Sequence, residues 1–212
     1  MSIQITRITT QKKHKDRYAL FQGDSFLTGV SQEILLKYSL HTGSILSEKE
    51  FNRLKKEERL IAIREQALRY LSRRAHSTKE LTLKLQQKGY ALKSIETVTA
   101  DLQKKGYLND VEFARMFLRE ELRLKRTGPL LIKNKLMIKG ISLETIEKIL
   151  VEMYDTRLQY ENCRTLAAKK LNTLQALPIE KQKQRVTGFL RQKGFGWEIC
   201  RQVYEVLFQE AS

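Results

Sequence analysis

The chain has 212 residues, 40 of them lysine or arginine and 24 aspartate or glutamate, and its net charge of +16 predicts an anionic partner. We favour nucleic acid or a nucleic-acid complex over an anionic membrane surface or an acidic protein. A hydrophobic content of 41% excludes a disordered chain. No apolar run approaches the ~20 residues that cross a bilayer, and the N-terminus lacks an apolar signal segment. The two cysteines form no Cys-x-x-Cys pair, so we expect a cytoplasmic protein without membrane contact.

The first fifty residues predict a small β-hairpin followed by a short helix. Aromatic and β-branched runs over residues 17–21 and 25–30 flank Gly23-Asp24, as in a hairpin turn. Ser31 is placed to cap a helix over residues 32–38. A polar, basic loop over residues 11–15 is expected before the hairpin. Whether this segment stabilises the fold, dimerises or binds a partner stays open.

From Ser47 onward the apolar periodicity is that of helices. Ser47-x-x-Glu50 is the pattern of a capping box, and it predicts a long helix that ends near Arg74.

A repeat organises the remainder of the chain. Three segments share the pattern Leu-x-x-Lys-Gly-apolar, and their glycines, Gly89, Gly140 and Gly194, lie 51 and 54 residues apart. Apolar residues recur at offsets −8, −4, +6, +9 and +13 from each glycine, which predicts one apolar stripe on each of two helices. The glycine is expected to end the earlier helix in the left-handed conformation, and the lysine before it suits the negative helix end.

Each repeat is therefore expected to hold three helices, of which the second ends at the glycine. In repeats two and three the first helix is predicted over residues 111–125 and 158–171. The second helix of repeat three should be about one turn longer, because Pro178 lies farther from its glycine than Pro129 does. The residues predicted to open helices are Ser77 with Glu80, Asn109 with Glu112, Gly128 with Pro129, and Leu177 with Pro178.

These patterns predict a mainly α fold, with three tandem three-helix bundles in an elongated, curved array. A small hairpin-containing segment precedes them. The expected domains are residues 1–48 for the hairpin and short helix, and then 49–109, 110–156 and 157–212 for the three repeats.

Basic residues gather on the first and second helices of the repeats, most heavily between residues 51 and 109, where 14 basic residues face 6 acidic ones. Four arginines, at positions 115, 119, 123 and 126, form a stripe, for which a binding role and a solvated helix face are both open. The candidate binding residues are Arg69, Arg73, Arg74, Lys84, Lys88, Arg115, Arg119, Arg123, Arg126, Lys133, Lys135, Lys139, Lys169, Lys170, Lys181 and Arg185.

Three-helix units also suggest a helix-turn-helix repressor, whose last helix would enter the major groove of DNA. Phosphates would repel the acidic side chains of the third helices, so base reading by these helices is disfavoured. Those side chains are Glu96, Asp101, Glu144, Glu147, Glu152, Glu198 and Glu205.

The chain lacks the motifs of common catalytic sites, including phosphate-binding loops and nucleophile elbows, and its Cys and His residues do not cluster. We expect neither an enzyme nor a metal or cofactor. Glu57-Glu58 and Glu120-Glu121 are interpreted as exposed helix positions, and His76 as a helix-end residue. Trp197, Tyr204 and Phe208 are interpreted as core residues rather than as platforms for base stacking.

Residues 60–155 resemble the RecX family, bacterial regulators of the RecA recombinase. The resemblance is carried by three stretches: Ala67-Leu68-x-x-Leu71 continuing to Ser77-x-x-Glu80-Leu81 and Lys88-Gly89-Tyr90, then Gly106-Tyr107-Leu108-Asn109-Asp110 with Phe113-Ala114, and Gly128-Pro129 with Lys139-Gly140-Ile141. The family often has an acidic residue where this chain has Asn109, and Asn caps a helix equally well.

The resemblance implies a regulator of DNA repair, recombination and the SOS response that binds in the groove of the RecA–single-stranded-DNA filament. It implies modulation, usually inhibition, of the ATPase and strand exchange, without a cofactor. Single-stranded DNA is an expected partner, duplex DNA a weak and non-specific one, and we expect a monomer. The helix-turn-helix repressor remains the alternative.

Overall fold

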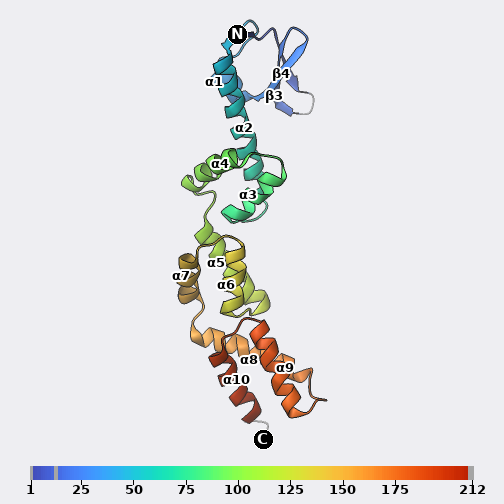
Figure 1. Ribbon diagram of the computed structural model, residues 1–212, viewed down its shortest axis with the longest axis vertical. Helices are drawn as coiled ribbons and strands as arrows, with labels where there is room; N and C mark the ends of the chain where they lie inside the picture. Colours follow the sequence, from blue (N-terminus) through green and yellow to red (C-terminus); the bar gives the residue numbers. More distant parts are fainter. Residues whose placement is uncertain (1, 12–13, 210–212) are drawn as a thin grey trace. The chain divides into compact units, whose positions relative to one another are not determined.

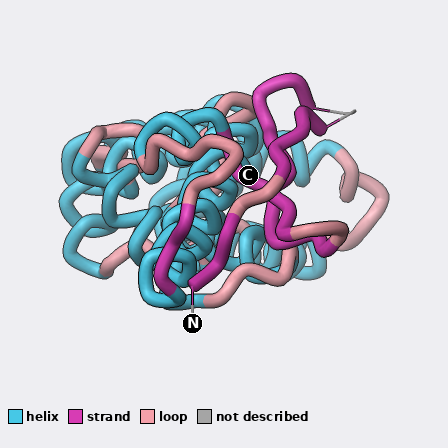
Figure 2. The backbone as a smooth tube through the Cα atoms, turned by 90° about the horizontal axis from the view of Figure 1, so that it is seen from above, coloured by secondary structure: helices cyan, strands magenta, loops and turns pink. Residues whose placement is uncertain are grey.

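The computed structural model describes residues 2–11 and 14–209. These residues form five strands and ten helices, and every described strand precedes residue 48. Figure 2 distinguishes the strands, in magenta, from the helices, in cyan. The chain folds into two compact units. The first unit comprises Met1–Arg74 and Leu81–Tyr107, and the second comprises Ala75–Glu80 and Leu108–Ser212. The predicted fold class of a mainly helical protein with three three-helix repeats is confirmed.

The first unit begins with two small antiparallel sheets. β1 (Ser2–Gln4) pairs with β5 (Ile45–Ser47), and β2 (Arg7–Gln11), β3 (His14–Gln22) and β4 (Ser25–Ser31) pair in that order. Figure 1 shows β3 and β4 side by side, as the hairpin prediction requires, and Gly23 turns between them with φ +57°. Strands β1, β2 and β5 were not expected.

The predicted basic loop is largely strand. Gln11 and His14 pair across the ends of β2 and β3, whereas Lys12 and Lys13 lie outside the described residues. The expected short helix is confirmed as α1 (Gln32–Lys37), where the hydroxyl of Ser31 accepts from the backbone N–H of Ile34 at 3.4 Å.

The long helix α2 (Glu48–Leu71) packs its N-terminal half against the sheets. Its capping box is formed as predicted, because the Ser47 hydroxyl accepts from the Glu50 N–H at 3.2 Å and the Glu50 carboxylate accepts from the Ser47 N–H at 2.8 Å. The helix ends at Leu71, three residues before the predicted end. Fully buried residues from strands and helices form this core, including Ile5, Leu20, Val30, Ile34 and Leu54.

Glu58 is buried within this core, so its interpretation as an exposed position is wrong. Its carboxylate accepts hydrogen bonds from Arg17 at 2.7 Å and from the backbone N–H and hydroxyl of Ser31 at 2.8 and 2.9 Å. A buried carboxylate is tolerated only with such compensation, and this one joins α2 to β3 and to the end of β4.

The three repeats follow the predicted order of helices. Repeat one uses the end of α2, α3 (Thr78–Gln87) and α4 (Leu92–Lys104). Repeat two consists of α5 (Asp110–Lys125), α6 (Pro129–Ile138) and α7 (Leu143–Met153). Repeat three consists of α8 (Thr156–Asn172), α9 (Ile179–Gln192) and α10 (Trp197–Gln209). With 14 residues against 10 in α3 and α6, α9 is about one turn longer, as expected.

The repeated apolar positions form the core of each repeat. All residues at offsets −8, −4, +6 and +9 are buried, whereas Met153 and Leu207 at offset +13 are half-buried. The buried set comprises Leu81, Leu85, Ile95, Val98, Ile132, Leu136, Ile146, Ile149, Val186, Leu190, Cys200 and Val203.

The repeated glycines end the second helices as predicted. Gly89, Gly140 and Gly194 have φ values of +85°, +84° and +87°. In each repeat the N–H after the glycine bonds to the carbonyl of the buried leucine at offset −4, at 3.3, 3.1 and 3.2 Å respectively. This is a Schellman arrangement, so the shared Leu-x-x-Lys-Gly-apolar pattern encodes a helix ending together with a core residue.

Within the second unit, the lysine carbonyl of the repeated Lys-Gly also accepts a hydrogen bond from the residue that opens another helix. Ser77 and Gly128 each lie twelve residues before the glycine of their own repeat. The Ser77 hydroxyl donates to the carbonyl of Lys139 at 2.7 Å, and the Gly128 N–H donates to the carbonyl of Lys193 at 2.8 Å. In repeats two and three alike, the end of the second helix thus accepts a hydrogen bond from the residue that opens the second helix of the preceding repeat.

Candidate interface with nucleic acid or a filament

The sixteen candidate basic residues are divided between the two units. Five lie in the first unit, Arg69, Arg73, Arg74, Lys84 and Lys88, and the other eleven lie in the second. Among the five, Arg69, Arg73, Arg74 and Lys88 are exposed, whereas Lys84 is half-buried and its ammonium lies 5.2 Å from the ring centre of Tyr70. The guanidinium of Arg69 donates to Gln66 on the same helix at 2.8 Å.

Arg115 joins two helices of repeat two. Its guanidinium donates to Glu112 on α5 at 2.7 Å and to Glu152 on α7 at 3.0 Å. The hydrogen bond with Glu152, followed by the one with Glu112, raises the pKa of Arg115. The side chain is 26% exposed, so this arginine is largely engaged within the repeat.

Glu121 organises a second polar cluster and is itself buried, so its interpretation as an exposed residue is wrong. Its carboxylate accepts from Lys125 at 2.8 Å, Lys135 at 2.6 Å and the hydroxyl of Thr127 at 2.7 Å. Burial acts to raise the pKa of Glu121, but the hydrogen bonds and the charge of Lys135 outweigh it and lower the pKa to about 2. Lys135 is thereby fixed to α5.

Two further candidate lysines also have intramolecular partners. Lys133 pairs with Glu147 of α7 at 2.9 Å. Lys139 pairs with Glu80 at 2.5 Å, and its ammonium lies 5.7 and 5.3 Å from the ring centres of Phe113 and Phe117. The acidic third helices therefore neutralise part of the basic excess internally.

Arg119 and Arg123 remain available on α5. Both are exposed, and neither forms an ion pair with a carboxylate of the described residues. Met116 and Leu124, exposed by 51% and 56%, lie on the same part of the helix. Arg126, the last arginine of the predicted stripe, is the C-cap residue of α5 with φ +49°, so it lies outside the regular helix. Arginine and methionine are enriched at protein interfaces, and Leu124 adds apolar area to this face.

The candidates in repeat three are more dispersed. Lys169, Lys181 and Arg185 are exposed on α8 and α9. Lys170 instead lies 5.6 Å from the ring centre of Phe189, which Lys193 approaches to 5.5 Å.

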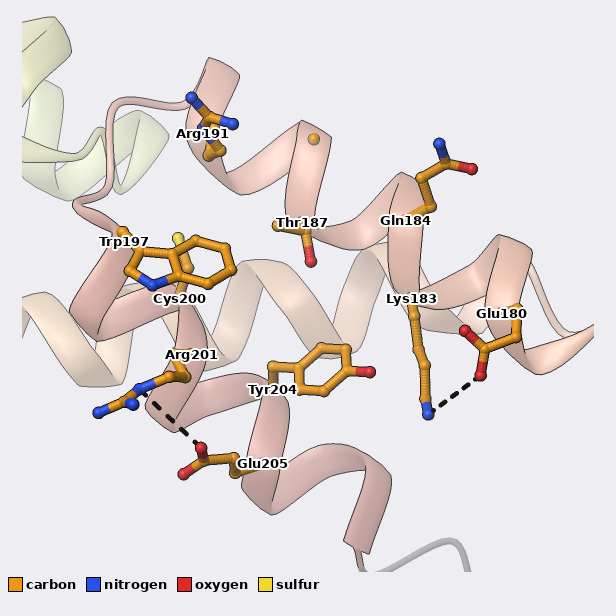
Figure 3. Close-up of a pocket in the computed structure, with 11 residues that line it drawn as sticks. Glu180, Lys183, Gln184, Thr187, Arg191, Trp197, Cys200, Arg201, Tyr204 and Glu205 are labelled. Carbon is orange, nitrogen blue, oxygen red and sulfur yellow. Dashed lines mark hydrogen bonds and ion pairs between the residues drawn. The ribbon is translucent and has the colours of Figure 1, made fainter.

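Sequence reasoning missed a groove between α9 and α10, with a volume of about 630 Å³ (Figure 3). Trp197, placed in the core by prediction, is 64% exposed along this groove, so that interpretation is wrong. Tyr204 lies beside it, and Lys183, Arg191 and Arg201 bring positive charge. Trp197 opens α10 at a position that precedes the repeated apolar offsets of this helix. In the sequence, this position is what indicates that the side chain is exposed.

No described helix is long and apolar enough to cross a membrane. Within residues 2–11 and 14–209, no group of His, Cys, Asp and Glu has the arrangement of a metal site. His76 lies buried directly before Ser77, at the predicted helix end.

Comparisons with known proteins match most of this chain. The RecX N-terminal domain matches residues 3–47, and the first, second and third three-helix domains of RecX match residues 64–102, 109–150 and 158–204. Regulatory protein RecX of Oceanobacillus iheyensis is 32% identical over 91% of this chain and 72% of its own length. That of Listeria welshimeri is 29% identical over 94% of this chain and 74% of its own length.

Two crystal structures share the fold. A regulatory protein RecX superimposes with a TM-score of 0.80 at 22% identity, covering 97% of this chain and all of the other. RecX from Lactobacillus salivarius superimposes with a TM-score of 0.66 at 26% identity, covering 72% of this chain and 99% of the other. The order of domains, the sequence identity and the fold agree, and the chain belongs to the RecX family.

Proposed function

We propose that this chain is a non-enzymatic regulator that binds the RecA–single-stranded-DNA filament and inhibits its ATP hydrolysis and strand exchange. The observation that carries the proposal is the match of all four RecX domains in order along the chain. The resemblance described from the motifs connects this family to RecA.

The surface of α5 supports a protein partner. Arg119 and Arg123 have exposed guanidinium groups, and the neighbouring exposed Met116 and Leu124 offer apolar area to a second surface. Arginine and methionine are enriched at protein interfaces, whereas a pure phosphate-binding stripe needs no apolar neighbours. We therefore place the contact with RecA on this face.

The function is tested by adding the protein to RecA, single-stranded DNA and ATP. We expect the rate of ATP hydrolysis and the mean filament length, measured by electron microscopy, to fall as the protein approaches saturation. An unchanged rate together with unchanged filaments would refute the proposed function.

The contact face is tested with the double variant R119E/R123E, which we expect to bind the filament at least tenfold more weakly because two attractive charges become repulsive. A matched control is K93E/K104E, which makes the same change of charge at two exposed positions of α4 outside the candidate set. Equal binding of the filament by the two variants would remove α5 from the interface. The circular dichroism of both variants should match the wild type.

A further inference from the structure

The groove between α9 and α10 combines an exposed aromatic ring with positive charge. Trp197 is the only tryptophan of the sequence, and its 64% exposure is unusual for so large an apolar side chain. Positions 197, 201 and 204 share one face of α10, so Trp197, Arg201 and Tyr204 line the same side of the groove (Figure 3).

The opposite wall contains a glycine that packing does not require. Gly188 lies inside α9, where glycine costs roughly 1 kcal/mol relative to alanine. A Cβ atom built there meets no atom within 4 Å, and its φ is not in the left-handed region, so neither close packing nor backbone conformation explains the residue. Its missing side chain leaves the groove wide opposite α10.

Three cations and two carboxylates line the groove, and one of the cations, Arg191, carries the positive charge in excess. Lys183 pairs with Glu180 at 3.3 Å, and Arg201 pairs with Glu198 at 2.9 Å and with Glu205 at 3.9 Å. Arg191 lines the groove and forms no ion pair with a carboxylate of the described chain. It is therefore available to a phosphate, whereas the ammonium of Lys183 lies 5.6 Å from the ring centre of Tyr204.

We propose that this groove binds single-stranded DNA, with a base stacked on Trp197 and a neighbouring phosphate held by Arg191. Aromatic rings bind bases of any sequence through their faces, and adjacent cations follow the backbone. An acidic peptide would use the charge but has no need of an open indole face. This proposal adds a direct contact with DNA to the proposed function. It rests on that function in one respect, namely that the RecA filament brings single-stranded DNA to the protein.

Because the chain has one tryptophan, its fluorescence reports on this site directly. Titrating the full-length protein with a thymidine 15-mer should quench the emission. An abasic 15-mer with the same number of phosphates should quench far less, and a duplex, whose bases are already stacked, should also quench little. Absence of quenching at saturation, or equal quenching by the thymidine and abasic strands, would overturn the proposal.

Variants test whether the indole ring and the open space of the groove are both needed for binding. W197A and G188L should each weaken binding of a labelled thymidine 15-mer about tenfold or more by fluorescence anisotropy, because the first removes the platform and the second fills the groove. Both sites are exposed, so helicity should be retained. Y107A, at an aromatic residue that is 62% exposed, is the matched control and should bind as the wild type does. Equal affinity of W197A, G188L and the wild type would contradict the proposal, as would an equal loss in Y107A.

The two proposals fail separately. If the protein changes RecA hydrolysis but its fluorescence is not quenched, the DNA groove is refuted and the regulatory function stands. If the fluorescence is quenched but RecA hydrolysis is unchanged, the groove stands and the regulatory function is refuted.

Discussion

A buried carboxylate with three donors, Glu121, stabilises repeat two through its charge. Its pKa of about 2 in the folded chain lies below the usual 4.5, so the unfolded state binds a proton more readily. This group therefore contributes its full stability above about pH 5 and loses it as the pH falls toward 2. The shift corresponds to about 3 kcal/mol of unfolding free energy.

We expect E121Q to lower the unfolding free energy at pH 7 by about 3 kcal/mol, and the difference from the wild type to vanish toward pH 2. Urea unfolding at a series of pH values measures this. The control is E120Q, at the adjacent exposed residue, which should follow the wild type at every pH. A constant difference between E121Q and the wild type across the pH range would show that its charge is not the cause.

Single residues marked the limit of prediction from the sequence. The exposed and buried members of Glu120-Glu121 look alike in sequence, because Lys135 and Thr127, which compensate the burial of Glu121, come from beyond the end of α5. Trp197 is likewise predicted to lie in the core because it sits beside the apolar stripe of repeat three, yet it is exposed. Helix periodicity predicts which face is apolar, but it does not identify the partners that allow a charged side chain to be buried.

At the scale of elements, the three helix endings differ in what surrounds the glycine. A Cβ atom on Gly89 meets no atom within 4 Å, whereas one on Gly140 would lie 2.7 Å from the Cβ of Lys79. On Gly194 it would overlap the backbone N and the side chain of Leu131. An alanine at any of the three positions would be strained by the positive φ, and at Gly140 and Gly194 its Cβ would also clash with a neighbouring residue.

We expect G89A to destabilise the protein by about 1–2 kcal/mol, G140A by more, and G194A by the most, because side-chain atoms of Lys79 can move more easily than the backbone of Leu131. Thermal unfolding of the three variants tests this order. G188A serves as the control, since an alanine in that helical position should be neutral or stabilising. Equal losses in the three variants would mean that the clash is relieved at no cost.

Local signals predicted the helices well and the small sheets poorly. The caps at Ser31, Ser47 and Asn109 and the glycine endings are encoded within a few residues, and each formed where expected. Strand β1 pairs Ile3 with Leu46, a partner more than forty residues away, and neither three-residue strand carries an alternating pattern long enough to recognise. Pairing at such a distance depends on the core around Ile5 rather than on local sequence.

At the scale of the whole molecule, the net charge of +16 overstates the charge available to DNA. Arg115, Lys133, Lys135 and Lys139 are held by carboxylates, and the third helix of repeat two, α7, supplies two of these. Binding to DNA should therefore depend on a limited number of phosphate contacts and on no particular sequence.

We expect the affinity for two unrelated single strands to be similar and to fall between 50 and 200 mM salt, with a log–log slope of about −0.7 for each phosphate neutralised. Anisotropy titrations measure the slope, and a duplex footprinting experiment with competitor DNA is the companion test. A footprint that survives competitor and moderate salt would favour the helix-turn-helix repressor instead.

The acceptor formed by the repeated Lys-Gly has a consequence for how such chains can change in length. The link joins a backbone carbonyl of the repeated Lys-Gly to an opening serine or glycine, so beyond these residues it makes little demand on the side chains of the repeat that is joined. Duplication of one repeat within the gene would supply both halves of a new link at once. A four-repeat chain built by copying residues 110–156 is therefore expected to fold, and the number of repeats becomes a variable on which selection can act without redesigning any core.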